Sequence, residues 1–190
     1  LQSLRGQNMA VRTLPSYSDL AEGRVTVNDI RELSISEILG RDMVAPDSAL
    51  MKRDIAYKTV LVTGAGGSIG SELCRQIFAQ SPKKLVLFDH SEYALYSILR
   101  ELQSKTTPEN AAVELIAILG SVTDKPRVAK LFLACAPDTV FHAAAYKHVP
   151  LVENNMFEGI KNNLFGTLVL SQAAINAGAK KFVLISTDKA

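Results

Sequence analysis

The chain has 190 residues, of which 47% are apolar and 21% charged, which is enough for one well-buried domain with some additional chain. Lysine and arginine together number 21 and aspartate and glutamate 19, so the formal net charge is only +2. This balance argues against a basic nucleic-acid-binding surface and against a disordered chain, and we expect no nucleic-acid partner.

No apolar run reaches the ~20 residues that a bilayer-spanning helix needs, and the N-terminal segment "LQSLRGQNMAVRTLPS" lacks the apolar core of a signal peptide. We therefore expect a soluble chain without membrane contact of its own. Cys74 and Cys135 have neither metal-ligand spacing nor an obvious disulfide partner. No metal site is expected, and a reducing, cytoplasmic compartment fits best.

Residues 1–56 are expected to form an extended N-terminal arm that connects the domain to an upstream region. They contain a short β-like piece near "MAVRTLP" and the segment "VNDIRELSISEILGRD". In that segment Ser34 or Ser36 could cap a short helix that ends at Gly40. This is too little sequence for a separate domain.

From Tyr57 onward, short β-rich runs alternate with helical patterns, as in parallel βαβ units. The runs are almost entirely apolar, which is typical of strands covered on both faces. They span 58–63, 84–89, 113–118, 138–143 and 181–186. Right-handed crossovers then predict an α/β, doubly wound Rossmann domain over 57–190, with five parallel strands in the order 3-2-1-4-5. We expect this domain to be incomplete at its C-terminus, because sheets of this kind usually contain further strands.

A glycine-rich turn, "TGAGGSIGSELC", follows the first predicted strand. Gly64, Gly67 and Gly70 permit a tight turn and a close approach of the backbone to a pyrophosphate, at the start of a helix that begins near Ser68 and Ile69. Such a glycine motif alone is a weak signal, but its position between a strand and a helix strengthens it. These five residues are predicted to bind a dinucleotide.

The second predicted strand ends at Asp89, about 20 residues after the glycines, where a carboxylate can accept hydrogen bonds from the adenosine ribose. Because a carboxylate would repel a 2′-phosphate, and because no arginine follows it immediately, NAD is expected over NADP. Asp89 could instead cap the helix that begins in "SEYALYSIL".

Small residues follow the third and fourth predicted strands. Ser121 and Val122 lie where the adenine ring should bind, and a run of alanines would leave room for a cofactor across the strand ends. The alanines are equally consistent with tight helix packing. They are Ala143, Ala144 and Ala145.

Four segments, "TGAGGSIG", "HAAAYKHVPLVE", "NNLFGT" and "ISTDKA", together resemble the extended short-chain dehydrogenase/reductases. More narrowly, they resemble the polysaccharide-biosynthesis branch with its bacterial membrane-anchored UDP-N-acetylglucosamine 4,6-dehydratases. The arm looks like the linker that precedes the catalytic domain in these proteins, so we expect the chain to be an excised, C-terminally truncated piece. The resemblance implies a UDP-sugar substrate, a homo-oligomer, and a whole protein at the cytoplasmic face of the bacterial inner membrane.

The resemblance assigns further residues to the site. Asn163 occupies the position of the asparagine that shapes the helix beside the nicotinamide, although it could be an ordinary helix residue, and Ser186 would lie at the cofactor. Lys147 and His148 would meet the sugar or its diphosphate, although both are also typical of a solvated loop. Many relatives carry aspartate at the position of Ser121, so adenine recognition here would rely more on backbone groups. The family's Tyr-x-x-x-Lys element would lie downstream.

A 4,6-dehydratase oxidises the sugar at C4, eliminates water across C5 and C6, and then reduces C6. By the resemblance, Asp188 is the acid at the C6 hydroxyl, Lys189 is the base at C5, and Thr187 helps to orient the C4 oxygen. These roles require a protonated carboxyl and a neutral amine, which burial in a closed site favours. Without that context the three residues would be only a polar strand end.

The sequence therefore predicts the NAD-binding part of a UDP-N-acetylglucosamine 4,6-dehydratase in capsule, O-antigen or glycan biosynthesis, inactive without its substrate lobe. One alternative is a nucleotide-sugar 4-epimerase, which has no use for an Asp–Lys pair. The other is a non-catalytic module that senses a dinucleotide.

Overall fold

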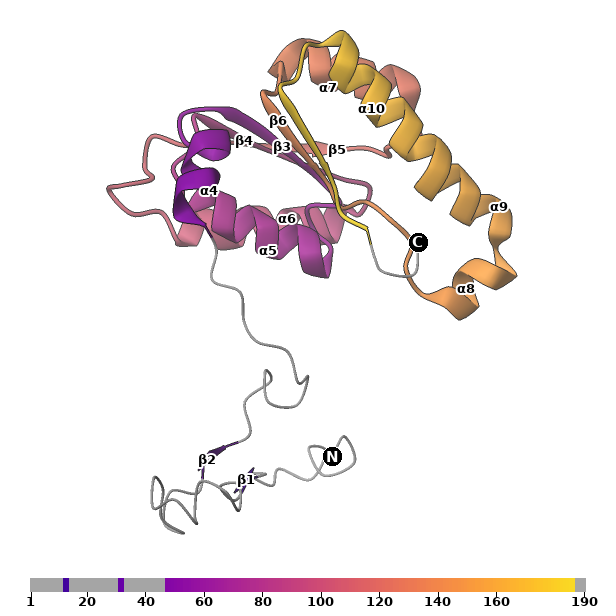
Figure 1. The fold of residues 1–190 in the computed structure, drawn as a ribbon, viewed down its shortest axis with the longest axis horizontal. Coiled ribbons are helices and arrows are strands. Elements are labelled where there is room, and N and C mark those ends of the chain that lie inside the picture. The colour runs from indigo at the N-terminus through magenta and orange to yellow at the C-terminus, as the bar shows by residue number, and fades with distance from the viewer. Residues whose placement is uncertain (1–11, 14–30, 33–46, 187–190) are drawn as a thin grey trace. The chain divides into compact units, whose positions relative to one another are not determined.

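The structure, a computed structural model, describes residues 12–13, 31–32 and 47–186 (Figure 1). The chain divides into two compact units, Leu1–Pro46 and Asp47–Ala190. In the first unit, two short strands pair in an antiparallel ladder; they are β1 (Arg12–Thr13) and β2 (Arg31–Glu32). The helix predicted in the arm lies outside the described residues.

A five-stranded parallel sheet forms the centre of the second unit. In spatial order its strands are β5 (Glu114–Leu119), β4 (Lys84–Asp89), β3 (Thr59–Thr63), β6 (Thr139–His142) and β7 (Lys181–Leu184). Counted along the chain, this order is 3-2-1-4-5, which confirms the predicted doubly wound α/β fold. The winding reverses between β3 and β6, and open sheets of this kind bind ligands at the carboxyl ends of the strands beside the reversal.

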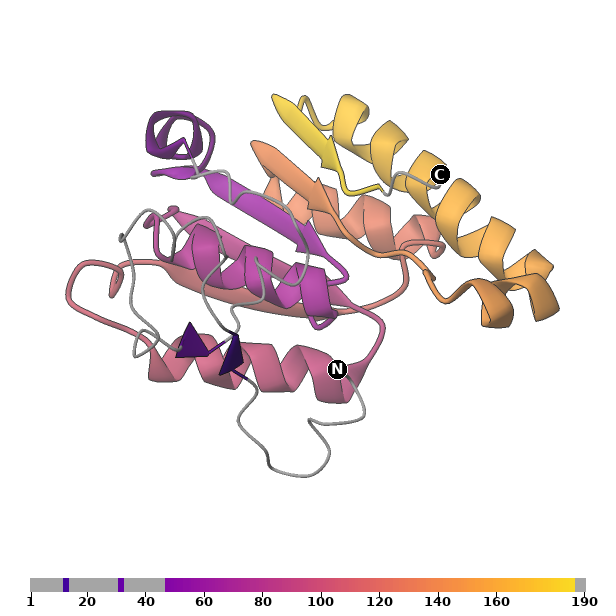
Figure 2. The same cartoon turned by 60° about the horizontal axis from the view of Figure 1, so that its bottom comes forward.

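Helices cover both faces of the sheet, as Figure 2 shows. One face carries α4 (Ser48–Ile55), α5 (Ser68–Phe78) and α6 (Glu92–Ser104), and the other carries α7 (Lys125–Cys135) and α10 (Thr167–Asn176). Because successive strand residues point to opposite faces, Val62 of β3 packs in the first layer with Ile77, whereas Leu61 packs in the second with Leu170. No helix among the described residues is long and apolar enough to span a membrane.

Three short helical segments connect β6 to α10. They are α8 (Val149–Asn154), α9 (Met156–Gly159) and the π-helix η1 (Ile160–Gly166). π-helical turns are rare and are frequently found at functional sites. This connection begins at the carboxyl end of β6 and therefore starts beside the winding reversal.

The edge strands are less buried than their apolar sequences predict. Strands β3 and β4 are covered on both faces, but Val183 and Leu184 of β7 are 38% and 52% exposed. The reason is position, because among the described residues β7 has a neighbouring strand on one side only. A continuous apolar run therefore does not distinguish a central strand from an edge strand.

Helix α4 lies within the segment 1–56 that the sequence assigns to the arm. In the structure its last residue, Ile55, is 3% exposed and packs in the core beside α5 and α6. The hydroxyl of Thr139, at the start of β6, donates a hydrogen bond of 2.7 Å to the carbonyl oxygen of Asp54. Helix α4 is thus attached to the sheet by both apolar and polar contacts.

Replacement of Leu102 by alanine should lower the free energy of unfolding by about 2–5 kcal/mol, because the truncation leaves a cavity in the core. Leu102 of α6 is fully buried, whereas Leu133 of α7 is 86% exposed. The matched control Leu133→Ala should change the free energy of unfolding by no more than ~0.5 kcal/mol. Denaturant titration of both variants measures the difference, and equal losses would contradict the core described above.

Candidate functional site

The loop from β3 to α5 approaches the end of β6 so closely that its first residue must be glycine. Gly64 has a φ of +66°, and a Cβ there would lie 2.8 Å from the carbonyl of Ala143 and from the Cα of Ala144. A Cβ at Gly70, in the first turn of α5, would lie 1.9 Å from the carbonyl oxygen of Gly64. Both overlaps are with backbone atoms, which could move only if a strand or a loop moved. Backbone packing therefore requires glycine at both positions.

The N-terminus of α5 has no side-chain cap. Its N-cap residue is Gly67, whereas α6 and α7, which begin at the same edge of the sheet, are capped by the side chains of Ser91 and Asp124. The first amides of a helix have no partner within the helix and attract anions such as phosphate. Ser68 and Ile69, in this first turn, are exposed and line a cavity. The start of α5 thus has the polarity and the access that a pyrophosphate requires.

The carboxylate of Asp89 joins the glycine loop to α6. Its Oδ2 accepts a hydrogen bond of 2.9 Å from the amide of Gly66, and its Oδ1 accepts one of 2.8 Å from the amide of Ser91. The residue that caps α6 is Ser91, whose hydroxyl accepts from the amide of Ala94. Asp89 is 6% exposed. A carboxylate has about four acceptor positions, so it can still accept hydrogen bonds from a ribose.

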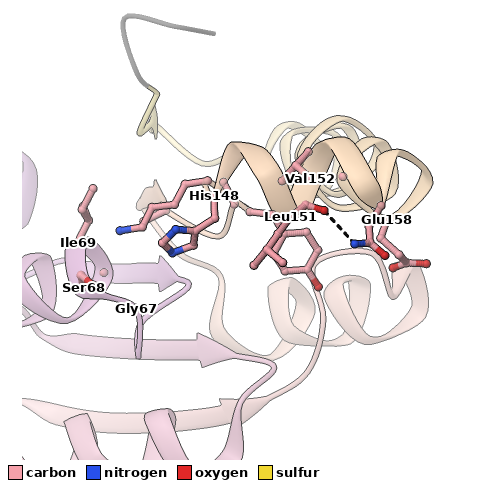
Figure 3. Close-up of a pocket in the computed structure, with 14 residues that line it drawn as sticks. Gly67, Ser68, Ile69, His148, Leu151, Val152 and Glu158 are labelled. Atoms are coloured by element: carbon pink, nitrogen blue, oxygen red, sulfur yellow. Dashed lines mark hydrogen bonds between the residues drawn. The ribbon is translucent and has the colours of Figure 1, made fainter.

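A cavity of about 510 Å³ at this edge lies between the start of α5 and the segments that follow β6. Figure 3 shows His148 between Ser68 and Ile69 of α5 on one side and Leu151 and Val152 of α8 on the other. The predicted residues in its wall are Gly67, Ser68, Ile69, Gly70, Ala143, Ala145, Lys147 and His148. The sequence did not single out the others, which are Tyr146, Leu151, Val152, Asn155, Glu158 and Gly159.

Two smaller cavities continue the crevice toward β4 and β5. One, of about 210 Å³, shares Gly67, Ala143, Ala145 and Tyr146 with the cavity of about 510 Å³. It is also lined by Gly64, Asp89, His90 and Ala144. The other is a pocket of about 10 Å³ that brings Ser121 and Val122 beside Asp89 and Ala144. The residues predicted for the ribose, the adenine and the pyrophosphate therefore line one continuous crevice.

Asn163 lies in the middle of the π-helix η1 and contacts the loop that follows β6. Its Oδ1 accepts a hydrogen bond of 2.9 Å from the amide of Tyr146, and its Nδ2 donates one of 2.9 Å to the carbonyl of the same residue. The side-chain amide thus bonds both the N–H and the C=O of Tyr146, as the backbone of a neighbouring β-strand would. Asn163 is not among the residues that line the three cavities, whereas its neighbour Asn162 lines the two smaller ones. Asn163 is connected to the two larger cavities through Tyr146, which lines both.

The last group of predicted residues lies at or beyond the end of β7. Ser186 is the last residue of the described segment 47–186. It is exposed, and it does not belong to the residues that line these three cavities. Thr187, Asp188 and Lys189 lie outside the described residues.

Comparison with known proteins decides the family. The family described as "Polysaccharide biosynthesis protein" matches residues 60–190, which contain the whole crevice. The chain belongs to this polysaccharide-biosynthesis family. The match confirms the resemblance of the four motifs and groups the chain with nucleotide-sugar dehydratases and epimerases.

Individual members of these groups are similar over most of the chain. The capsular polysaccharide biosynthesis protein CapD of Staphylococcus aureus is 44% identical over 177 residues, 93% of this chain. The inverting UDP-N-acetylglucosamine 4,6-dehydratase of Campylobacter jejuni is 31% identical over 134 residues, 70% of this chain. This chain spans only 29% and 37% of the lengths of these two relatives.

A solved structure shares the fold of the domain. It is a UDP-glucose 4-epimerase from Stenotrophomonas maltophila with bound NAD and formylated UDP-arabinopyranose. The match has a TM-score of 0.58 and 26% sequence identity, and it covers 70% of this chain and 38% of the epimerase. NAD-binding epimerases are thus structural neighbours of this polysaccharide-biosynthesis domain.

The sequence did not single out one buried polar residue beside the crevice, His142. His142, the last residue of β6, is 1% exposed and contacts two threonine hydroxyls, those of Thr63 and Thr167. Burial lowers the pKa of His142 to about 4, so the ring is neutral at physiological pH. The available signal was a histidine inside an otherwise apolar strand, directly before the alanines of "HAAAYKHVP".

The NAD binding that the sequence predicts should be abolished by replacement of Gly70 with alanine, because the new Cβ would overlap the carbonyl oxygen of Gly64 and force α5 away from the loop. Gly178→Ala is the control: Gly178 has a positive φ of +72°, which strains alanine, but a Cβ added there would meet no atom within 4 Å. The control should lose about 1 kcal/mol of stability and keep its NAD affinity. Calorimetry with NAD, together with thermal unfolding, separates the two effects. Equal NAD affinities for the two variants would contradict the assigned loop.

Proposed function

We propose that this chain is the NAD-binding part of a nucleotide-sugar 4,6-dehydratase that acts on UDP-N-acetylglucosamine. The observation that carries the proposal is the continuous crevice at the carboxyl edge of the sheet, which runs from Asp89 to His148. The similarity to a UDP-N-acetylglucosamine 4,6-dehydratase supports the choice of reaction and substrate. The whole protein would work as a homo-oligomer at the cytoplasmic face of the bacterial inner membrane, in capsule, O-antigen or other glycan synthesis.

The residues of the crevice fit NAD in three respects. The uncapped amides at Ser68 and Ile69 would hold the pyrophosphate, and Asp89 would accept hydrogen bonds from the adenosine ribose. Ser121 and Val122 would border the adenine. When bound, NAD supplies reversible oxidation and reduction of the sugar.

Ser121 could not recognise adenine as an aspartate would. Its hydroxyl lies 2.8 Å from that of Thr123 and accepts from the amide of the same residue at 3.2 Å, in a turn at the start of α7. Val122 is 4% exposed, and a Cβ at Gly166 of η1 would lie 2.7 Å from its Cγ2. These contacts support an adenine site built from backbone groups and apolar surface rather than from a charged side chain.

The cavity of about 510 Å³ would hold the sugar end of the substrate. Lys147 and His148 are exposed in its wall, where a cation would neutralise a diphosphate. Glu158 and Asn155 lie in the same wall and offer acceptors and donors to sugar hydroxyls. The cavity therefore provides the two chemical functions, anion binding and hydroxyl recognition, that a nucleotide sugar needs.

Elimination would be carried out by the residues that follow Ser186. Neutral Lys189 would accept the C5 proton, protonated Asp188 would donate a proton to the C6 hydroxyl, and Thr187 would orient the C4 oxygen. The electron pair of the C5–H bond forms the C5–C6 double bond as the C6–O bond breaks, and water leaves. A C4 ketone makes this possible because it acidifies the C5 proton.

A 4-epimerase is the second candidate function, and the structural match to an NAD-containing epimerase favours it. An epimerase would use the same crevice for the cofactor and the same oxidation at C4. It would have no step for an acid and a base at C6 and C5. The product therefore distinguishes the two enzymes.

The full-length protein should convert UDP-N-acetylglucosamine to a UDP-4-keto-6-deoxy sugar, detected by NMR or mass spectrometry. Lys189→Ala should lower kcat by at least ~100-fold, because the base is lost, while Lys180→Ala, at an exposed lysine before β7, should not. The 190-residue chain alone should show no turnover.

Two outcomes would contradict the dehydratase. Formation of UDP-N-acetylgalactosamine by the full-length protein, in place of the 4-keto-6-deoxy sugar, would indicate an epimerase. Full biological function of Lys189→Ala without turnover would favour a sensor.

NAD should bind at least ~10-fold more tightly than NADP, because the carboxylate of Asp89 would repel a 2′-phosphate across a partly desolvated site. Asp89→Asn should reduce this ratio, whereas Glu92→Gln, which removes an exposed carboxylate nearby in α6, should not. Calorimetry with both cofactors measures the ratio. Tighter binding of NADP by the unmodified protein would contradict the assignment of Asp89.

A further inference from the structure

A continuous series of hydrogen bonds joins the ends of β3 and β6 to the π-helix η1, next to residues that line the crevice. The Oγ1 of Thr63 lies 2.7 Å from Nδ1 of His142, and the Nε2 of that ring lies 2.8 Å from Oγ1 of Thr167. The hydroxyl of Thr167 donates a bond of 2.7 Å to the carbonyl of Asn163, whose side chain makes the two bonds to the backbone of Tyr146. The series thus connects β3, β6, η1 and the loop after β6.

The bonds allow only one tautomer of the neutral imidazole. A carbonyl oxygen can only accept, so the single hydroxyl proton of Thr167 is committed to Asn163. Thr167 must then accept a proton from the ring, which places the proton of His142 on Nε2. The unprotonated Nδ1 accepts from the hydroxyl of Thr63, so both hydroxyl protons and the ring proton have an acceptor.

The elements joined in this way include both walls of the crevice. Thr63 immediately precedes Gly64, the residue that must approach Ala143, and Ala143 immediately follows His142. At the other end of the series, Tyr146 lines both larger cavities. A movement of the π-helix relative to the sheet would therefore shift the boundary between these two cavities.

We propose that His142, as its Nε2–H tautomer, is a positioning residue that holds the π-helix η1 against the ends of β3 and β6, so that Asn163 can set the place of the Tyr146 loop. The ring touches neither cavity, so its effect is exerted through Thr167 and Asn163. The expected effect of this role on NAD binding rests on the proposed cofactor site. The role itself does not depend on the sugar chemistry.

Packing alone does not account for the arrangement. An apolar side chain could fill the volume of His142. The imidazole ring also packs edge-on against the ring of Phe182, with 6.1 Å between the two ring centroids. An apolar replacement would leave the buried hydroxyl of Thr63 without its acceptor, and it would remove one of the two hydrogen-bond partners of the half-buried hydroxyl of Thr167. A buried polar group without a partner is costly. The π-helix η1 is a rare conformation, and the bonds of Thr167 and Asn163 are contacts that connect it to β6 and to the loop after β6.

The tautomer can be tested in the unmodified 190-residue chain by ¹⁵N NMR of the histidine rings at neutral pH. We expect His142 to show a protonated Nε2 and an unprotonated Nδ1, with one set of shifts. A proton on Nδ1, or rapid exchange between tautomers, would overturn the proposal. This result does not depend on whether the protein is a dehydratase.

The positioning role can be tested with two variants. Thr167→Val removes the hydroxyl and keeps the shape of the side chain, whereas Thr167→Ser keeps the hydroxyl and removes the methyl group. Ser171→Ala is the control, because Ser171 lies one turn later in α10 and bonds only to the carbonyl of Leu168 among the described contacts. In Thr167→Val we expect the amide signals of residues 145–148 to shift and NAD to bind roughly 10-fold more weakly, as for loss of a buried hydrogen bond.

Thr167→Ser should return both readouts toward the unmodified values, and Ser171→Ala should change neither. If Thr167→Val lowers only the melting temperature, with the amide signals and the NAD affinity unchanged, His142 is merely structural and the proposal is wrong. Failure of the unmodified full-length protein to bind NAD would contradict the proposed function, while the amide shifts would still decide the positioning role.

Discussion

The contact between Gly64 and the backbone of Ala143 and Ala144 is the constraint on which the crevice depends. It brings the ends of β3 and β6 together at the winding reversal, with no side chain between them. The amide of Ala143 also donates to the carbonyl of Thr63 at 3.1 Å, so the parallel ladder extends into the loops. Because the strands stay together, the loops must turn apart just beyond them, and the crevice opens where they separate. Small residues are needed along its floor for the same reason.

Asp89 stabilises the resulting loop before any ligand is present. A buried carboxylate is costly unless it is hydrogen-bonded, and here each oxygen accepts a bond from a backbone amide, of Gly66 and of Ser91. The charge is thus compensated by two segments that both border the crevice. A ligand that adds ribose hydroxyls would complete this arrangement rather than create it. Such preorganisation lowers the entropy that binding must overcome, which explains why a loop rich in glycine can still form a defined site.

The parts of the fold that follow from local patterns were predictable, and those that depend on distant partners were not. Apolar runs and helical spacings were enough to predict the strand order, and the glycines, Asp89 and the alanines indicated the crevice because each type of residue has a steric or electrostatic reason to be there. The π-helix η1 was missed because its hydrogen-bond pattern has no residue signature. His142 was missed because its partners are far away in sequence, separated from it by 79 and 25 residues.

The hydrogen-bond series through His142 explains why polar residues are tolerated at the centre of this sheet. Each member is neutral, so no charge is buried, and both hydroxyl protons and the ring proton have an acceptor. Among the described residues, no buried side-chain nitrogen or oxygen lacks a partner. Removal of the hydroxyl of Thr63 would leave Nδ1 of His142 without its donor, and removal of the hydroxyl of Thr167 would leave the ring proton without its acceptor. Each loss would therefore leave a polar group of the buried ring unpaired in a low-dielectric interior, at a cost beyond the lost bond itself. A series in which every member supports its neighbours is suited to hold the two sides of the crevice in register.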